Sequence, residues 1–267
     1  MNYVRFLAWI ALMADLVIAM GSAIANANSG TFEVDLISPR NETYTPQALM
    51  PIVFALQSPP LAFTLEAAIS WELWEGNNRS SPGSVTDGLL ELGLLNLTSS
   101  EPHFVTRFIN TLAYPDGFWT FVWSLQIYKC SQGEGSTQRI STKNTTIFTV
   151  SQSGQAPNLV ATTSSEMCGT MEAYAFNVTS KGDTCGVLGP SPTTNQCAAT
   201  INPSAASSIY AAATAFACDP LQRPVNPNVT CPHFTGKSPN DAGQSRMAAA
   251  STLLLLLTMV TALFHLG

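Results

Sequence analysis

Two long runs of alternating apolar and polar residues constrain the fold of this chain more than any other feature. The first, Phe63–Trp74, has an apolar side chain at every second position from Phe63 to Leu73. The second, Gly117–Cys130, repeats the pattern with large aromatic and aliphatic residues. Because successive side chains of a strand point to opposite faces, each run predicts a strand with one buried face.

Shorter candidate strands share this period and are separated by polar turns: Phe32–Leu36, Met50–Leu56, Phe104–Tyr114 and Thr145–Val150. The turn Tyr114-Pro115-Asp116-Gly117 predicts a hairpin, since Pro and Gly favour a tight reversal there. The apolar run Leu89–Leu97 fits either a strand or a helix. We therefore predict a mainly β chain, an antiparallel Ig-like or fibronectin-like β-sandwich. The Cys…Trp…Cys spacing of true Ig domains is absent, so this likeness is one of architecture.

The composition changes at Ser151, where Ser, Thr, Asn, Pro and Gly become more frequent. Met171–Val178 fits a further strand, and the Ala-rich segment Ser204–Ala217, after Asn202-Pro203, predicts a short helix. We therefore expect a β-sandwich domain at 26–150, a disulfide-rich extension packed on it at 151–231, and a stalk at 232–240.

The first residues have the three parts of a secretory signal. Met1–Arg5 carries a positive charge, Phe6–Met20 is apolar, and small residues follow. We predict a signal peptide at 1–25, with cleavage after Ala25 and Ala27 as the alternative.

The last residues, Met247–Gly267, are apolar and long enough to span a bilayer, and no Lys or Arg follows them. Before them come three small residues, beginning at Asn240, and a polar spacer, Gly243–Thr252. This order is typical of a glycosylphosphatidylinositol signal. We predict lipid attachment at Asn240, with Gly243 as second choice, and removal of 241–267 as a propeptide. A transmembrane helix is the alternative.

Cysteines and glycosylation motifs agree with export. The even number of cysteines favours three disulfides in an oxidising compartment, and they are Cys130, Cys168, Cys185, Cys197, Cys218 and Cys231. Sequence leaves fifteen pairings open, and closing the shortest loops gives Cys185–Cys197 and Cys218–Cys231, with Cys130–Cys168 left over. Asn-x-Ser/Thr triplets predict N-glycosylation in exposed loops or edges at Asn41, Asn78, Asn96, Asn144, Asn177 and Asn228. Asn195, before Gln196-Cys197, is a weaker match.

Catalytic and metal-binding patterns are scarce. No Gly-x-Ser-x-Gly or Cys-x-x-Cys motif occurs, and His103 and His233 are the only histidines of the exported part. Glu72 and Glu75 could form the acid pair of a glycosidase, but they fall on opposite faces of their strand, which favours a salt-bridging or solvated role. We predict no catalytic residue, metal or cofactor, and we lean against an enzyme.

Trp74 is the large apolar residue on the polar face of its strand, where it could stack on a sugar ring. The alternative, which we favour, is that the Cys-rich extension covers it. The formal net charge of −6 argues against nucleic-acid binding, which requires a basic face.

The opening segment, Gly30–Tyr44 (GTFEVDLISPRNETY), is followed by Met50–Gln57 (MPIVFALQ). These residues resemble the start of a domain of unknown function found in secreted proteins of filamentous fungi. The resemblance extends more loosely through the two Trp-containing strands and the cysteine-rich part. It implies a fungal source and an extracellular or cell-wall setting, and it carries over no catalytic residues.

Together these features predict a secreted, N-glycosylated, lipid-anchored cell-surface or cell-wall protein with a structural or recognition role. A carbohydrate-binding module or carbohydrate-active enzyme acting on wall polysaccharide is the alternative. The expected partners are the outer leaflet of the plasma membrane, through the lipid anchor, and wall polysaccharide.

Overall fold

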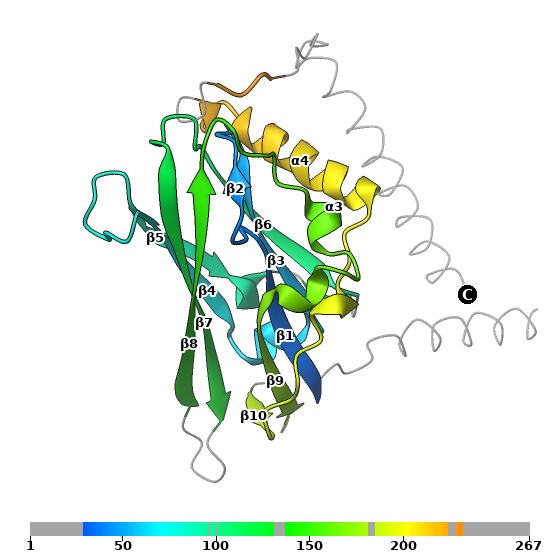
Figure 1. The fold of residues 1–267 in the computed structure, drawn as a ribbon. Coiled ribbons are helices and arrows are strands. Elements are labelled where there is room, and N and C mark those ends of the chain that lie inside the picture. The colour runs from blue at the N-terminus through cyan, green and yellow to red at the C-terminus, as the bar shows by residue number, and fades with distance from the viewer. Residues whose placement is uncertain are drawn as a thin grey trace, which may run out of the picture. The chain divides into compact units, whose positions relative to one another are not determined.

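A computed structural model of the chain contains two five-stranded β-sheets that pack face to face (Figure 1). It describes residues 29–231 apart from 96, 100, 131–136, 181–184 and 224–227. The predicted signal peptide, stalk and attachment signal, with Asn240 and Gly243, lie outside the described residues, as does His233. Every helix and strand given below belongs to the first of two compact units, Met1–Val229; the second is Thr230–Gly267.

The first sheet has the strand order β10-β9-β1-β3-β6, and the second has the order β2-β8-β7-β4-β5. The strands of the first sheet are β1 (Ser29–Ser38), β3 (Met50–Gln57), β6 (His103–Ile109), β9 (Glu172–Ser180) and β10 (Gly186–Leu188). Those of the second are β2 (Thr43–Tyr44), β4 (Ala68–Glu75), β5 (Val85–Glu91), β7 (Gly117–Cys130) and β8 (Thr137–Val150). Neighbouring strands are antiparallel except β2 and β8, which are parallel. The predicted β-sandwich is confirmed.

Short helices connect the strands and cover one face. They are α2 (Leu61–Thr64), η1 (Leu92–Leu94), α3 (Leu159–Thr162), η2 (Cys168–Thr170), η3 (Gln196–Ala198) and α4 (Pro203–Ala217). The predicted helix after Asn202 is confirmed as α4, and the Asn202 side chain caps it by accepting a hydrogen bond from the Ala205 N–H at 2.8 Å. Within the part of the chain that the structure describes, no helix combines the length and hydropathy needed to cross a membrane.

The main core lies between the sheets. Trp123 of β7 packs against Phe54 of β3 with ring centroids 5.3 Å apart, and Trp119 and Trp71 are also buried. Full burial of each such aromatic side chain contributes roughly 1.5–3 kcal/mol of hydrophobic stabilisation. The alternation of the Gly117–Cys130 run therefore fixed both the bounds and the buried face of β7.

A second apolar layer covers the outer face of the first sheet. Ile37, Val53 and Ala55 point away from the main core and pack against residues of α3, η2 and the segment before α4. Figure 1 shows α3 and α4 beside β1, β3 and β6. The chain after residue 150 therefore does two things: it adds β9 and β10 to the sandwich, and it covers β1 and β3.

Three details differ from the sequence prediction. β8 begins at Thr137, eight residues before the predicted strand Thr145–Val150. Phe63 is not on the buried face of a strand, because Pro59-Pro60 precedes the short helix α2 and β4 begins only at Ala68, so Phe63 is 68% exposed. The Tyr114–Gly117 turn does not close a hairpin, because β6 pairs with β3 in the first sheet while β7 lies in the second. A turn sequence specifies a reversal of the chain, not the partner strand.

The disulfide pairs also differ from the shortest-loop prediction. Cys130 is bonded to Cys185, and Cys168 to Cys197, so the predicted pairs Cys185–Cys197 and Cys130–Cys168 are wrong. Cys218 and Cys231 are disulfide-bonded as well, which leaves no free cysteine. The Cys130–Cys185 bond joins the end of β7 to the residue before β10, so it connects the two sheets.

Candidate functional site

An apolar groove of about 600 Å³ lies at one end of the second sheet. Its lining combines aromatic, aliphatic and acidic side chains, and it is formed by Phe63, Glu66, Ala67, Ala68, Leu89, Glu91, Gly93, Leu94, Gln126 and Tyr128. Large apolar residues are unusually accessible here: Phe63 is 68%, Leu89 52% and Leu94 77% exposed. An exposed apolar concavity of this size is typical of a ligand-binding site.

The short helix α2 positions the two groove residues Phe63 and Glu66. Glu66 adopts a left-handed conformation (φ 44°) just after α2, where its N–H donates to the Phe63 carbonyl at 3.1 Å. The next residue, Ala67, donates to the Ala62 carbonyl at 2.9 Å, which completes a Schellman-type helix end. Glycine normally holds the left-handed position, because it has no side chain to clash with the backbone. A glutamate at this position is strained, so it lowers the stability of the fold relative to a glycine.

The other wall of the groove comes from β5 and η1. Glu91 pairs with Ala68 of β4, which places it beside the end of α2. Gly93 donates its N–H to the Ala67 carbonyl at 2.9 Å, and a side chain at Gly93 would lie 3.3 Å from the Glu66 Cα. This close approach holds η1 against the helix end. Glu66 and Glu91 therefore line one groove although they are 25 positions apart in the sequence.

The groove suits a neutral ligand that has both hydroxyl groups and an apolar face. Two carboxylates can hydrogen-bond hydroxyls, while Phe63 and Tyr128 offer aromatic surface. The Gln126 amide is already bonded, since it accepts from Arg139 and donates to Ser70. Among the described residues that line the groove, none is Lys or Arg, and two are glutamates, so the lining does not favour a negatively charged ligand.

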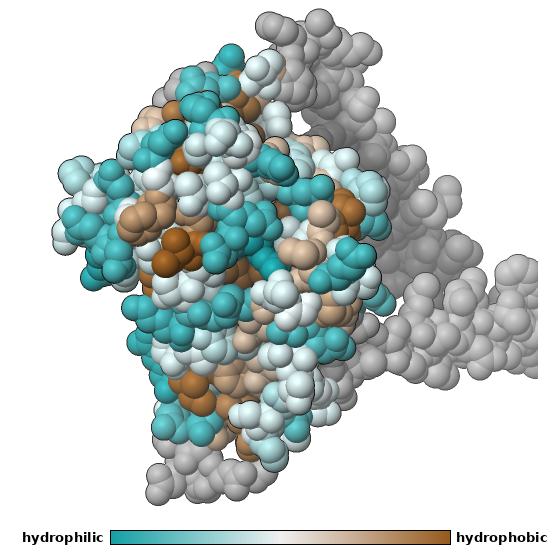
Figure 2. Space-filling model, in the orientation of Figure 1, coloured by the Kyte–Doolittle hydropathy of each residue, from teal (hydrophilic) through white to brown (hydrophobic). Residues whose placement is uncertain are grey.

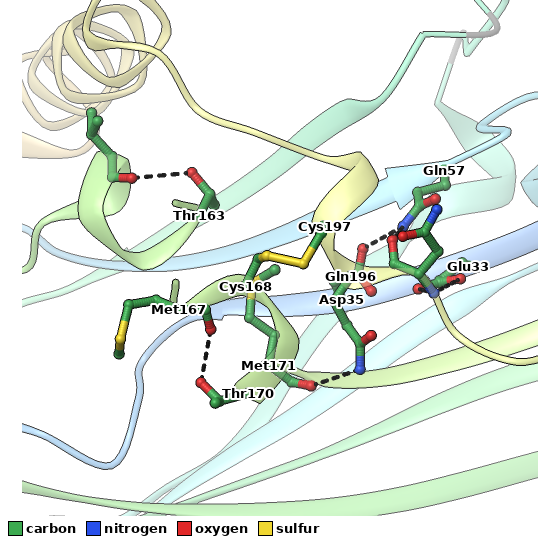
Figure 3. Close-up of a disulfide and its surroundings, with 12 residues drawn as sticks. Glu33, Asp35, Gln57, Thr163, Met167, Cys168, Thr170, Met171, Gln196 and Cys197 are labelled. Atoms are coloured by element: carbon green, nitrogen blue, oxygen red, sulfur yellow. Dashed lines mark hydrogen bonds between the residues drawn. A yellow bond between two sulfur atoms is a disulfide. The ribbon is translucent and has the colours of Figure 1, made fainter. Parts of the chain in front are cut away.

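A second polar site is buried beneath the covering layer of the first sheet (Figure 3). Glu33 and Asp35 of β1 are 1% and 0% exposed, although their strand alternation suggested a solvent-facing side. Both Glu33 carboxylate oxygens accept the Asn195 N–H, at 2.7 and 2.9 Å. Gln57 donates to Asp35 at 2.9 Å and to the Asn195 carbonyl at 2.8 Å. The carboxylates thus anchor the backbone at Asn195, two residues before Cys197 of the Cys168–Cys197 disulfide.

The protonation of Asp35 is unusual. Burial raises its pKa from 3.8 to about 8; Gln57 opposes this, while the hydrogen bond with Glu33 and the Glu33 charge add to it. Asp35 Oδ1 has no hydrogen-bond partner among the described residues while the carboxyl is ionised. A proton on Asp35 lets it donate to the neighbouring carboxylate. Because both acids are buried, they stabilise the fold and cannot contact a substrate in this structure.

Trp74, the residue predicted to stack on a ligand, lies on the outer face of the second sheet. The Cys-rich segment covers the first sheet instead, so the expectation that it covers Trp74 is wrong. The Trp74 indole N–H donates to Glu72 at 2.7 Å, and the Lys143 ammonium lies 5.7 Å from the ring centroid. Figure 2 shows the surface over β7 and β8 as mostly hydrophilic with separate apolar spots. The ligand-stacking role of Trp74 stays a prediction.

The carboxylates near Trp74 have structural partners. Glu72 forms a bidentate ion pair with Arg79, with N–O distances of 2.7 and 2.9 Å. Partial burial raises the pKa of Glu72, but the hydrogen bonds from Arg79 and Trp74 and the charges of Arg79 and Lys143 outweigh it, so the pKa is lowered. Glu75 pairs with Trp119 and accepts a hydrogen bond from Ser81. The salt-bridging interpretation of Glu72 is confirmed.

The glycosylation motifs occupy different surroundings. Asn41, Asn78 and Asn228 are exposed outside the long strands, whereas Asn144 of β8 and Asn177 of β9 are half-buried within strands. Asn96 lies outside the described residues. The histidine His103 is exposed on β6. No cluster of three or more His, Cys, Asp or Glu that could hold a metal ion is found in the described ranges.

The sequence pattern does not reveal the groove, because three separate segments, 63–68, 89–94 and 126–128, form it. The available signal was Phe63 and Glu66 beside Pro59-Pro60, which mark a break before the strand. The period-two alternation continues through Phe63 and Glu66, so the pattern predicts that both belong to the strand.

Comparison with known proteins gives a family and no further relative. No curated protein and no solved structure matches the chain. A family model described as a domain of unknown function, DUF7136, matches residues 27–231, which include the whole sandwich and its covering layer. The chain therefore belongs to the DUF7136 family of domains of unknown function.

Proposed function

We propose that this protein is a fungal cell-surface glycoprotein that binds a neutral wall polysaccharide in the groove between α2, η1 and β5. The observation that carries this proposal is the lining of that groove: exposed Phe63 beside Tyr128, with Glu66, Glu91 and Gln126 around them. Aromatic rings contact the apolar faces of sugars, and planar polar side chains bond their hydroxyls. A lining without Lys or Arg favours glucan, chitin or mannan over an acidic polymer.

The proposed location is extracellular, with the chain N-glycosylated and held by a lipid on the outer leaflet. The three disulfides fit an oxidising compartment. The leader, the polar spacer and the apolar tail support export and anchoring. Release from intact cells by a phosphatidylinositol-specific phospholipase would support the anchor. A mature chain that still ends at Gly267 would contradict it.

We expect Phe63→Ala to weaken polysaccharide binding about fivefold, since an aromatic contact is worth roughly 1 kcal/mol. Because Phe63 is 68% exposed, the thermal midpoint should barely change. The assay is sedimentation of the purified protein with insoluble glucan, chitin or mannan.

Phe216→Ala is the matched control for Phe63→Ala, because Phe216 is 60% exposed on α4 and does not line the groove. Equal binding by Phe63→Ala and wild type would refute the groove as the site. Loss of binding in Trp74→Ala instead would move the site to the outer face of the second sheet.

Glu66→Gly should raise stability and lower binding at once. Glycine relieves the left-handed backbone strain, for a gain of about 0.5–1 kcal/mol in the free energy of unfolding, while the carboxylate is lost. Urea unfolding and the sedimentation assay measure the two effects. Glu101→Gly, on an exposed loop outside the groove, is the control for loss of a surface charge. A variant that binds as wild type does would show that Glu66 takes no part in recognition.

The second candidate function is hydrolysis of a polysaccharide, and the pairing of Glu66 with Glu91 in one groove favours it. Release of reducing sugar by the purified protein, abolished in both Glu66→Gln and Glu91→Gln, would establish it. Binding without release would leave the non-enzymatic proposal standing.

A further inference from the structure

A cavity of about 330 Å³ lies between the β1–β2 turn and η2. Its lining is Leu36, Pro39, Arg40, Asn41, Glu42, Thr146, Met167, Thr170 and Glu172. The cavity is separate from the groove described above, with which it shares no lining residue.

Two buried polar groups in this cavity lack partners among the described residues. Arg40 is 9% exposed, and its Nη1 has no hydrogen-bond partner, although its other terminal nitrogen donates to Thr170 Oγ1. Thr146 is also 9% exposed, and its Oγ1 is unpartnered. Leaving a buried donor unsatisfied costs about 1–3 kcal/mol, more when the group is charged. Because two such groups line one cavity, we infer that a molecule in the cavity hydrogen-bonds both of them.

The turn before the cavity holds Arg40 in place. Its backbone N–H donates to the Tyr44 hydroxyl at 2.9 Å, and its carbonyl accepts the Glu42 N–H at 2.8 Å. These bonds fix the backbone of the turn, and the hydrogen bond to Thr170 holds the guanidinium, so this donor loses little entropy on binding.

The charge of the lining selects against a simple anion. Glu42 and Glu172 border the same cavity as Arg40, so the ionised side chains sum to about −1. A neutral molecule with both hydroxyl donors and carbonyl or hydroxyl acceptors matches this mixture of groups. Leu36, Pro39 and Met167 add apolar surface for the ring or a methyl group.

Asn41 identifies the occupant. It is exposed, it lines the cavity, and it begins the glycosylation triplet Asn41-Glu42-Thr43. A sugar linked to Asn41 Nδ2 would start at the edge of the cavity, where tethering gives it a high effective concentration. We propose that the first N-acetylglucosamine of an Asn41-linked glycan fills this cavity and hydrogen-bonds Arg40 Nη1 and Thr146 Oγ1. This inference rests on the proposed secretion and N-glycosylation, and not on the polysaccharide groove.

The experiment uses the full chain secreted from a glycosylating yeast and trimmed enzymatically to one sugar per site. Thr43→Val removes the Asn41 triplet while keeping a β-branched residue in β2, and Ser80→Ala removes the Asn78 triplet in an exposed loop as the matched control. We expect Thr43→Val to lower the thermal midpoint by about 3–6 °C, equivalent to the loss of one or two hydrogen bonds, and Ser80→Ala to leave it unchanged. Asn41→Gln should reproduce the Thr43→Val shift.

Peptide mass spectrometry separates the two ways in which this proposal can fail. An unmodified Asn41 beside occupied Asn78 and Asn228 would overturn the cavity proposal and leave the proposed glycoprotein standing. No modified site in the chain would overturn both. A glycosylated Asn41 whose removal shifts the midpoint no more than Ser80→Ala does would show that the sugar stays in solvent. A glycan at Asn41 that a native-state endoglycosidase releases more slowly than the one at Asn78 would support the cavity directly.

Discussion

Replacing Cys168 and Cys197 together with alanine should destabilise the protein by about 3–4 kcal/mol. The Cys168–Cys197 bond closes a loop with a sequence separation of 29. Breaking it restores conformational entropy to the unfolded chain, which for a loop of this length is worth about 3–4 kcal/mol. For a domain of this size the thermal midpoint should fall by about 10 °C. Differential scanning calorimetry of wild type and the double variant measures the loss.

Loss of the Cys168–Cys197 disulfide should also loosen the segment around Asn195, in addition to lowering the overall stability. Cys197 is two residues from Asn195, whose backbone N–H bonds Glu33 and whose carbonyl accepts from Gln57. Without the disulfide, η3 is held to the first sheet chiefly by these hydrogen bonds and by the packing of Ala199 and Ile201. In the double alanine variant of Cys168 and Cys197, we therefore expect the amide of Asn195 to exchange faster than the amides of buried strand residues such as Phe54.

The matched control is the double alanine variant of Cys130 and Cys185. It should cost about 4 kcal/mol by the same entropy argument, since its sequence separation is 55, but it should leave exchange at Asn195 slow. Binding at the groove should survive the loss of Cys168–Cys197, because no groove residue lies in the covering layer. If both variants affected Asn195 equally, the disulfide would have no local role over Glu33.

Sequence patterns predicted the parts of the fold that local chemistry decides. The bounds of β7 and the helix after Asn202 follow from residue period and capping. The long-range features could not be obtained in this way. Cys130 pairs with Cys185 because β9 and β10 return to the first sheet, which is a property of the topology.

The burial of Glu33 and Asp35 shows the same limit at one site. Their strand reads as apolar on one face and polar on the other, which normally means that the polar face meets solvent. The segment that covers them arrives more than 130 residues later and contributes the Asn195 backbone N–H to Glu33, while the Gln57 amide that bonds Asp35 comes from β3. A backbone hydrogen-bond partner leaves no signature in the sequence. The groove was missed for a related reason, since α2, β5, η1 and β7 must come together to form it.

The stability of the protein should fall as the pH rises from about 4 to about 8, and Asp35→Asn should remove most of that fall. In the unfolded chain Asp35 loses its proton near pH 3.8, whereas burial holds its pKa near 8 in the folded protein. Between these values the folded state binds more protons than the unfolded state, so deprotonation opposes folding. The contribution is fully present below pH 3.8 and is lost as the pH rises through 8.

Asparagine has the shape of a protonated aspartate and keeps a donor for Glu33 and an acceptor for Gln57. The variant should therefore match wild type near pH 4 and exceed it at pH 8, by an amount of the order of a few kcal/mol. Urea unfolding at intervals between pH 4 and pH 9 gives both curves. Other carboxylates change stability with pH as well, so the quantity to follow is the difference between the variant and wild type.

Asp116→Asn is the control, because Asp116 is exposed in the turn between β6 and β7 and its replacement removes the same charge. Its curve should run parallel to that of wild type across the whole range. A parallel curve for Asp35→Asn would mean that Asp35 titrates as an ordinary carboxyl and that Asn195 is held by Glu33 alone. A difference that grows from about pH 4 to about pH 8 and then levels off would instead place the proton on the buried pair, as its contacts imply.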